Sequence, residues 1–489
     1  MRSDPSNWHI SEKPPSDIEK WEQDEDVLDT WASSWLWPLA TLGWPDEEAM
    51  EEKGLDYFYP TSALVTGPDI IFFWVARMIM AGLEFNGRSY KPEQAIPDSE
   101  IPKRIPFKDV YFTGIIRDDQ GRKMSKSLGN SPDPLDLIAK YGADGLRHGI
   151  MSIAPKGQDI RFSEERIEQG RNFCNKLWNV SRFRLMSADL EDNSMVELII
   201  LRIQSDLVNE DDQAILLRLV ETLDQVEKLY GEYEFNAVLQ TIYRFFWNDF
   251  CDWYIEASKS RIQDSSSKNT CLAIQDICLR HILLLLQPVT PFITEELWTL
   301  LGFSNGNSIQ NVSPGTGDEL LKKLAADGLK LDPNVLDEMQ SVRDLVTSMR
   351  SLKADRNLSN NRNVAFSFLA DDTKAEVLVR HTKSILVTVG ASALNRVEQA
   401  PSGMPALVTP FGSVYLDLST GIDLNAEKAR LQKELEQLEK IVNSVKGKLA
   451  SNDFTSKAPP HIIEGARHQL LENQDKLNET IEALDALNS

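Results

Sequence analysis

The sequence predicts a multidomain fold in which an α/β region is followed by an all-α region, a small α+β module and a C-terminal antiparallel coiled coil. The chain has 489 residues, more than the roughly 100 to 200 residues of a typical domain. Its hydrophobic periodicity changes from mixed strand and helix patterns to helix alone, and finally to a heptad repeat. Several separately folded parts are therefore expected.

Composition excludes a disordered chain and gives no sign of a membrane span. Hydrophobic residues make up 42% and charged residues 26% of the sequence, as in ordinary globular proteins. The longest apolar stretch, residues 70–83, is interrupted by Arg77 and is shorter than the roughly 20 residues that a membrane helix needs. The acidic N-terminal segment lacks a signal or transit pattern, so we expect a cytoplasmic protein. The four cysteines are scattered without a CxxC pair, which predicts reduced core thiols and no metal site.

The net charge of −23 disfavours a surface that is basic throughout, because nucleic-acid binding depends on Lys and Arg. Charge is unevenly distributed, however, and basic residues outnumber acidic ones between residues 101 and 190. A local basic surface on an acidic protein is compatible with this pattern.

The N-terminal third predicts α/β architecture. Residues 1–26 are polar and contain three prolines, and we interpret them as a linker or the remnant of an insertion. Residues 27–163 alternate strand-like and helical runs, which is typical of an α/β region. Asp69 and Asp133 stand where each could cap a helix by accepting a backbone hydrogen bond. The expected strands are residues 62–66 and 109–116, and the expected helices are residues 69–83 and 134–152.

Residues 164–331 predict a helical bundle, because their periodicity is almost wholly helical. Pro288 and Pro291 interrupt one helix, and Thr294 is expected to cap the next, over residues 295–301. Residues 302–331 are rich in Gly, Ser and Asn and read as a linker. The expected bundle helices are residues 211–230, 235–259 and 270–286.

The last two parts are a small α+β module, residues 332–422, and a coiled-coil arm, residues 423–489. The module combines a helix over residues 335–355 with strand-like runs at 363–369 and 413–418. In the arm, apolar residues recur at steps of four and three, then every seven after a Pro-Pro break, which predicts an antiparallel helical hairpin. The first seam is Leu431, Leu435, Leu438, Val442, Val445 and Leu449.

The sharpest chemical signal is the pentapeptide KMSKS at residues 123–127. Two ammonium groups three residues apart, with hydroxyl neighbours, suit a triphosphate because they neutralise charge that moves onto leaving pyrophosphate. A solvated basic turn is the alternative for any two lysines, but the full pentapeptide has a chance expectation on the order of 1 in 10,000. It resembles the signature loop of class I aminoacyl-tRNA synthetases.

The resemblance extends over nearly the whole chain and narrows to the valyl-tRNA synthetase family. Motifs before residue 180 are similar to the second half of that family's Rossmann-like catalytic domain, and later ones to its helical anticodon-binding domain. The tail is similar to its coiled coil, which favours valyl over isoleucyl or leucyl relatives. The motifs are DVLDTW (26–31), LGWP (42–45), VTG (65–67), DIIFFW (69–74), GQDI (157–160), RNFCNKLW (171–178), FCDWY (250–254), PFITEELW (291–298) and GID (421–423).

The resemblance implies an ATP site around the signature loop. Lys126 would contact ATP and stabilise the transition state of adenylate formation, and Lys123 would support it. Asp69 would hydrogen-bond the adenosine ribose, whereas a plain helix cap is its alternative role. ATP would bind with Mg²⁺ as a phosphate-charge clamp, and no tightly bound cofactor is expected. The implied ATP-binding residues are Lys123, Ser125, Lys126, Ser127, Gly67 and Asp69.

The resemblance also places Trp31, Ile70 and Trp74 around the valine side chain. A small branched substrate needs a tight apolar wall, although core packing is the usual fate of such residues. A hydrophobic pocket rejects threonine only about a hundredfold, so the family needs an editing site. Its editing domain is inserted upstream of residue 26 and is not found in this sequence.

tRNA binding is suggested by the bundle and the tail as well. Aromatic and basic residues interleave at residues 243–247, a composition that can stack anticodon bases, although most of these rings should be core. In the tail, a stripe of basic side chains would contact tRNA. The alternative is that these side chains form an ordinary solvated face of the coiled coil. The tail residues implicated are Lys440, Lys446, Lys448 and Lys457.

Because no His-x-Gly-His segment occurs, the first half of the nucleotide-binding fold is also missing. We interpret the chain as a C-terminal portion of a valine-tRNA ligase, inactive without that half. The expected partners are valine tRNA, ATP and valine. Apart from a possible N-terminal half, we expect the protein to be a monomer. The alternatives are a non-catalytic tRNA-binding protein, the C-terminal subunit of a split synthetase with a separate N-terminal half, and, more weakly, an isoleucyl-tRNA synthetase.

Overall fold

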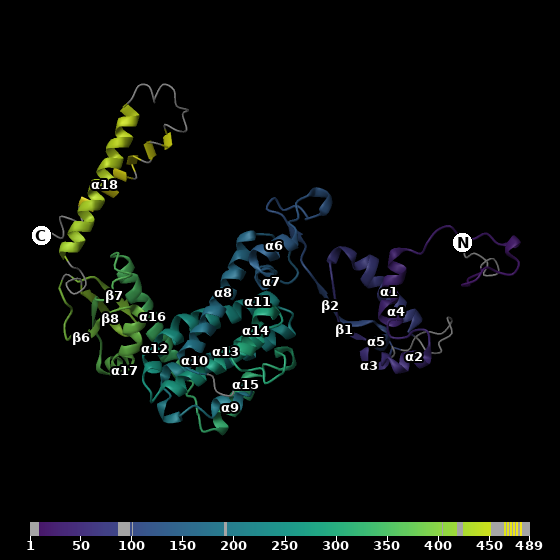
Figure 1. The fold of residues 1–489 in the computed structure, drawn as a ribbon, viewed down its shortest axis with the longest axis horizontal. Helices are drawn as coiled ribbons and strands as arrows, with labels where there is room; N and C mark the ends of the chain where they lie inside the picture. Colours follow the sequence, from purple (N-terminus) through teal and green to yellow (C-terminus); the bar gives the residue numbers. More distant parts are fainter. Residues whose placement is uncertain are drawn as a thin grey trace. The chain divides into compact units, whose positions relative to one another are not determined.

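The computed structural model describes residues 9–86, 98–99, 101–189, 193–402, 404–417 and 424–450, with single positions between 464 and 481. The chain forms two compact units whose elements are labelled in Figure 1. One comprises Met1–Arg182, Leu223–Tyr243 and Ile282–Pro314, and the other comprises Phe183–Thr222, Arg244–His281 and Gly315–Ser489. The chain passes between them several times, so the units are interleaved in sequence.

Two parallel strands organise the first part of unit 1. Strands β1 and β2 pair with Val65 beside Tyr111, and helices lie in the connection between them, as parallel strands require. The expected strand at 62–66 is confirmed as β1. The elements are α1 (Thr30–Ala40), α2 (Glu47–Glu52), α3 (Leu55–Phe58), β1 (Thr61–Thr66), a 3-10 turn (Pro68–Ile70), a π-helical turn (Ile71–Val75), α4 (Ala76–Phe85), α5 (Ile101–Arg104) and β2 (Phe107–Phe112).

A small apolar core holds α4 against this sheet. Val75, Met78 and Phe107 are buried, and Trp74 packs on them. The helix approaches closely at Gly82, where a Cβ atom would lie 2.4 Å from the carbonyl oxygen of Arg104. Any larger residue there would force the helix off the chain segment that leads into β2.

The rest of the α/β region contains a second pair of parallel strands and three helices. The predicted single helix over residues 134–152 is wrong, because Gly142 adopts φ 79° and divides it. Asp133 caps the first half by accepting from the backbone N–H of Leu135, as predicted. The expected strand at 109–116 is likewise divided between β2 and β3. The elements are β3 (Ile116–Arg117), α6 (Pro134–Tyr141), α7 (Ala143–Ser152), β4 (Ile160–Arg161) and α8 (Glu164–Ser187).

The helical region agrees with the predicted bundle in most helices but differs in three places. The expected helix over residues 235–259 contains a long π-helical stretch. The helix expected at residue 295 begins at Pro291, with Thr290 as its N-cap residue, because Pro fits the first helical position. The expected linker contains α15, which starts with a capping box between Thr316 and Glu319. The elements are α9 (Val196–Ile200), α10 (Glu210–Gly231), α11 (Phe235–Tyr243), the π-helix (Arg244–Ile255), α12 (Glu256–Gln263), α13 (Lys268–Leu286), α14 (Pro291–Leu300) and α15 (Gly317–Ala326).

Helix α13 is long and apolar enough to cross a membrane by length and composition, but 94% of its apolar window is buried inside the fold. Burial of that extent is what a core helix shows. All four cysteines are free and buried, which confirms the prediction of core thiols.

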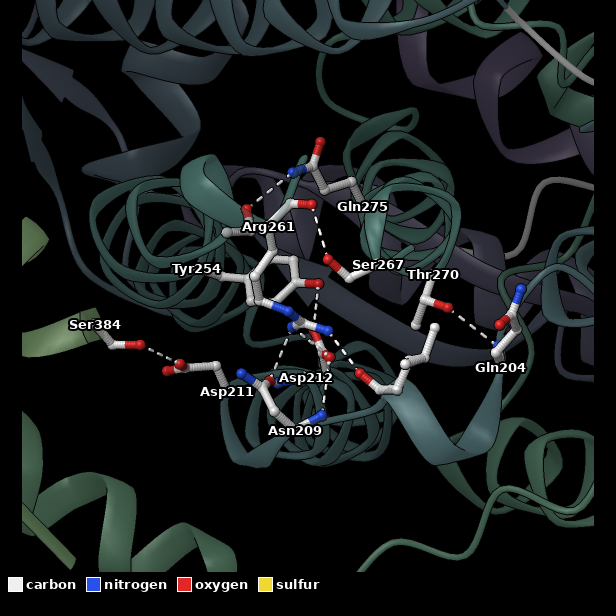
Figure 2. A network of polar contacts seen from close by, with 12 residues as sticks. Gln204, Asn209, Asp211, Asp212, Tyr254, Arg261, Ser267, Thr270, Gln275 and Ser384 are labelled. Atoms are coloured by element: carbon white, nitrogen blue, oxygen red, sulfur yellow. Dashed lines mark hydrogen bonds and ion pairs between the residues drawn. The ribbon is translucent and has the colours of Figure 1, made fainter. Parts of the chain in front are cut away.

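Buried charges are paired in unit 2. Asp276, fully buried, accepts hydrogen bonds from Arg184 at 2.7 and 2.8 Å and from Arg202 at 3.0 Å. Figure 2 shows a second network, in which Asp212 accepts from Arg261 at 2.6 Å and from the hydroxyl of Tyr254 at 2.7 Å. Removing one partner from such a pair would leave a buried charge uncompensated.

The small α+β module contains a four-stranded sheet in the order β6-β5-β8-β7. Strand β5 is parallel to β6 and antiparallel to β8. A hydrogen bond from Ser384 to Asp211, at 2.7 Å, links the module to α10 (Figure 2). The elements are α16 (Val335–Ala354), β5 (Ala365–Leu369), α17 (Asp372–Val389), β6 (Ala393–Arg396), β7 (Ala406–Thr409) and β8 (Gly412–Asp417).

Helix α18 (Leu424–Ala450) is the long helix of the C-terminal arm. Val442 and Val445, both in the predicted seam, are buried. Leu435, Leu438 and Leu449 are half-buried. The seam residues with described side chains are therefore the less exposed part of this helix.

Candidate active site

The signature loop is a folded turn that starts at the end of β3. The backbone N–H of Met124 donates to the carbonyl oxygen of Ile116 at 3.1 Å, and Arg117 forms a β-bridge with Lys123. Lys126–Leu128 forms one 3-10 turn, followed by Gly129 at φ 62°. The loop thus returns toward the strand that it leaves.

Asp118 and Asn130 tie the two ends of the loop together. The Nδ2 group of Asn130 donates to Asp118 Oδ2 at 2.9 Å, and its Oδ1 atom accepts from the backbone N–H of Ser125 at 3.0 Å. Asp118, 6% exposed, also accepts from the backbone N–H of Arg122 at 2.8 Å. The hydrogen bond from Asn130, with those from Arg122, lowers the pKa of Asp118 to about 2. Sequence reasoning missed both residues; their only signal is their position on either side of the pentapeptide.

Asp69 is held by Lys123. The ammonium group of Lys123 lies 2.8 Å from Asp69 Oδ2, and both side chains are about half exposed. This hydrogen bond and charge lower the pKa of Asp69. The short helix at this point has Gly67 as its N-cap residue, so Asp69 lies in the first turn, two positions after the cap, and its role at the ribose stays a prediction. A Cβ at Gly67 would lie 2.8 Å from Asp69 Oδ1, so glycine leaves room for the carboxylate.

The remaining loop residues are described in part. The hydroxyl oxygens of Ser125 and Ser127 are 3.2 Å apart, and the backbone N–H of Leu128 donates to Ser125 Oγ at 3.3 Å. The backbone of Lys126 lies in the 3-10 turn, whereas its side chain is outside the described part of the structure. Geometry therefore joins Lys123 to Asp69 and leaves the prediction for Lys126 as it stands.

The residues predicted to contact valine lie in two environments. Trp31 stacks on Phe73 with ring centroids 6.1 Å apart, and Ile70 is half-buried. Trp74 instead packs on the α4 core, and its indole Nε1 is buried without a hydrogen-bond partner in the described chain. Trp74 also lines a cavity of about 1010 Å³ whose lining includes Trp37 and contains neither Trp31 nor Ile70.

An ion pair that sequence reasoning missed fixes the helix that carries Trp31. Asp29 accepts from the backbone N–H of Trp31 and also pairs with Arg77 of α4. One carboxylate thus caps α1 and joins it to α4. The aromatic side chains of this part of the site are positioned by that contact.

The predicted tRNA contacts are distributed over the helical parts. Lys440, Lys446 and Lys448 are exposed on α18, and Lys457 lies outside the described residues. In the aromatic run at residues 243–247, Phe245 and Phe246 are fully buried. Trp247 is half-buried and Tyr243 is 39% exposed, so the expectation that most of these rings are core holds for two of the four.

Comparison with known families covers most of the chain. Residues 4–163 match the model for class I tRNA synthetases (I, L, M and V), residues 212–367 match the anticodon-binding domain of tRNA ligases, and residues 423–488 match the tRNA-binding arm of valyl-tRNA synthetase. The last match distinguishes valyl from isoleucyl relatives.

Two curated relatives are similar to nearly the whole chain. The valine–tRNA ligase of Listeria monocytogenes is 37% identical over 98% of this chain, and that of Bacillus subtilis is 39% identical over 94%. These matches cover 51% and 49% of the relatives, so the chain spans about half their length. A solved leucyl-tRNA synthetase of Agrobacterium radiobacter K84, complexed with tRNA, is 22% identical with a TM-score of 0.45, covering 62% of this chain and 34% of its own. The chain belongs to the valyl-tRNA synthetase family and corresponds to a C-terminal portion of its members.

Proposed function

We propose that this chain supplies the signature loop and the tRNA-binding parts of a valine–tRNA ligase. In this reaction a carboxylate oxygen of valine attacks the α-phosphorus of ATP, pyrophosphate leaves, and the valyl group then passes to the terminal ribose of valine tRNA. The observation that carries the proposal is the ion pair of 2.8 Å between Lys123 and Asp69. It brings the loop's first cation to the end of β1, where a parallel sheet binds nucleotide.

The proposed roles follow from charge. Lys126 and Lys123 would stabilise the negative charge that develops on the leaving pyrophosphate, with Mg²⁺ entering as part of the ATP substrate. Because Lys123 is paired with Asp69, ATP would replace this ion pair with phosphate contacts and release the carboxylate for the ribose. Trp31 and Ile70 would form the wall against valine.

A substitution at Lys126 tests the catalytic proposal. In the chain combined with an N-terminal half, Lys126→Ala should lower valine-dependent ATP–pyrophosphate exchange by about a hundredfold or more, because a transition-state contact is lost. Binding of tRNA should not change. Lys140→Ala is the matched control, since Lys140 pairs with Glu164 at 2.6 Å outside the loop. An exchange rate equal to that of the control would refute the role of Lys126.

A specific surface favours a split enzyme with a separate N-terminal half. Strand β1 pairs on one edge with β2 and on the other with no described strand. Val65 on this strand is 59% exposed, and Phe72 in the following turn is 81% exposed. An open edge beside exposed apolar side chains is a site for an added strand, and we propose that the first half of the nucleotide-binding fold supplies it.

Mixing the two halves separates the candidates. Recovered exchange would support the split enzyme. Demonstrated assembly without exchange would instead favour the second candidate, a non-catalytic tRNA-binding protein. That candidate rests on the match of residues 212–367 and 423–488 to tRNA-binding regions, neither of which needs the catalytic half.

We also propose the domain layout predicted above, with an anticodon-binding bundle at 164–331 and an arm at 423–489 folded as an antiparallel coiled coil. The burial of Val442 and Val445 supports a seam on α18. Lys440, Lys446 and Lys448 are exposed and available for tRNA phosphates. A cytoplasmic monomer, apart from any N-terminal partner, completes the proposal.

A further inference from the structure

The GQDI motif at residues 157–160 has no part in the proposed chemistry, yet it lies against the base of the signature loop. Strand β4, which begins at Ile160, pairs in parallel with β3, and the backbone N–H of Ile160 donates to the carbonyl oxygen of Ile115 at 2.9 Å. A Cβ atom on Gly114 would lie 1.9 Å from the carbonyl oxygen of Gln158, so only glycine permits this approach. The motif therefore packs directly on the chain that leads into the loop.

Asp159 of this motif is fixed by two hydrogen bonds. Its Oδ2 atom accepts from Arg117 Nε at 2.5 Å, and its Oδ1 atom accepts from the backbone N–H of Ile115 at 3.1 Å. The hydrogen bond from Arg117, with that from Ile115, lowers the pKa of Asp159, so the carboxylate is charged at neutral pH. Both side chains of the ion pair are more than a third exposed, and a pair this exposed contributes little to stability. Its main effect is therefore on the orientation of Arg117.

Arg117 carries this orientation into the loop. Its guanidinium group is planar and rigid, so the bond from Nε to Asp159 sets the direction of Nη1, which donates to the carbonyl oxygen of Gly121 at 3.2 Å. Gly121 adopts φ 80° in the turn before Lys123. Lys123 then forms its β-bridge with Arg117, and its ammonium group pairs with Asp69 at 2.8 Å. A continuous series of contacts thus leads from Asp159 to the first cation of the loop.

We propose that Asp159 is a positioning residue for the signature loop. Through Arg117 it holds the turn from which the side chain of Lys123 extends. Asp118 and Asn130 join the loop to itself, whereas Asp159 joins it to the start of β4. The inference rests on the proposed function, because that function assigns Lys123 to the phosphates of ATP.

The chemical reactivity of Lys123 in the whole chain tests the positioning. An ammonium group held in an ion pair reacts slowly with an acylating reagent such as N-hydroxysuccinimidyl acetate, and mass spectrometry gives the rate at each lysine. Asp159→Asn should make Lys123 react about threefold faster or more, because the loop opens more often, and should change the melting temperature little. Arg117→Lys should have the same effect, since an ammonium group keeps the charge but lacks the second donor at a fixed angle.

Two controls accompany this measurement. Asp119→Asn removes an exposed carboxylate from the same turn and should leave the rate at Lys123 as it is in the unsubstituted chain. Lys140, whose ion pair lies outside the loop, should react at one rate in all of these chains. If neither of the two test substitutions raises the rate at Lys123 above that of the Asp119→Asn chain, the positioning role is overturned.

Exchange kinetics then separate this inference from the proposed function. In the chain combined with an N-terminal half, Asp159→Asn should lower kcat for valine-dependent ATP–pyrophosphate exchange about tenfold and leave KM for valine unchanged, because a misplaced charge is missed mainly in the transition state. A kcat equal to that of the Asp119→Asn control would overturn the role of Asp159 in the reaction. If Lys123 responds as expected but the assembled, unsubstituted halves show no exchange, the proposed function fails instead.

Discussion

At the scale of single residues, His148 is buried at a cost that its neighbours do not offset. It is 7% exposed and stacks on Phe173 with ring centroids 4.4 Å apart, and neither ring nitrogen has a hydrogen-bond partner in the described chain. Desolvation lowers its pKa to about 4. An unpaired buried polar group is destabilising, so this position serves the packing of α7 on α8 and would suit an apolar ring.

We therefore predict that His148→Phe stabilises the protein and reduces its acid sensitivity. Between pH 7.5 and 5 the histidine becomes protonated in the unfolded chain, where its pKa is about 6.5, but stays neutral in the folded protein. The free energy of unfolding therefore falls by about 2 kcal/mol on this acidification because of this side chain. The variant should lose that contribution and gain about 1 kcal/mol at pH 7.5. His281, whose pKa is also lowered to about 4, keeps its own dependence.

Denaturant unfolding at the two pH values measures this effect. The exposed His9 provides the control substitution, His9→Phe, which should follow the unsubstituted chain at both pH values. A His148→Phe chain that loses as much stability on acidification as the unsubstituted chain would contradict the assignment.

At the scale of elements, the signature loop depends on its two ends being joined. Asn130 makes hydrogen bonds to Asp118 and to the backbone of Ser125, and bonds to a charged partner contribute about 1.5 to 3 kcal/mol. Asn130→Ala should therefore open the loop about tenfold more often and speed tryptic cleavage at Lys123 and Lys126 in proportion. Asn360→Ala, in an exposed loop of the small module, is the control. If Asn130→Ala is cleaved no faster than this control, the hydrogen bonds of Asn130 do not hold the loop closed.

Sequence patterns predicted the long helices because their periodicity is local. The divided helix at Gly142 was missed because a glycine is compatible with a helix until its φ of 79° is known. The start at Pro291 was missed because Thr294, whose hydroxyl instead donates to the carbonyl oxygen of Thr290, is itself a good capping residue. Each error concerns a boundary, where one residue can serve two roles.

The signature loop could be predicted from the sequence, but the contacts of its residues could not. A rare pentapeptide identified the loop, but the contact of Lys123 with Asp69 joins residues 54 positions apart, and no local pattern encodes it. Asn130 and Asp118 were missed because a single amide or carboxylate near a turn is common. Contacts that depend on tertiary structure are thus what the sequence left open.

At the scale of the whole molecule, the fold distributes the proposed functions over separate parts. The signature loop lies in unit 1, whereas α18, which carries the proposed tRNA-binding lysines, lies in unit 2. An open edge on β1 accounts for why adenylate formation would need the N-terminal half. In the proposed function, tRNA binding rests on the parts that match the anticodon-binding domain and the tRNA-binding arm, so we expect recognition to be measurable with this chain alone.

The most direct test of that claim is competition between valine tRNA and isoleucine tRNA for the purified chain at near-physiological salt, where nonspecific phosphate attraction is screened. Circular dichroism would first establish that the helices are formed. We expect a preference for valine tRNA of about tenfold or more, equivalent to about 1.4 kcal/mol. Equal affinity for the two tRNAs in a folded chain would contradict it.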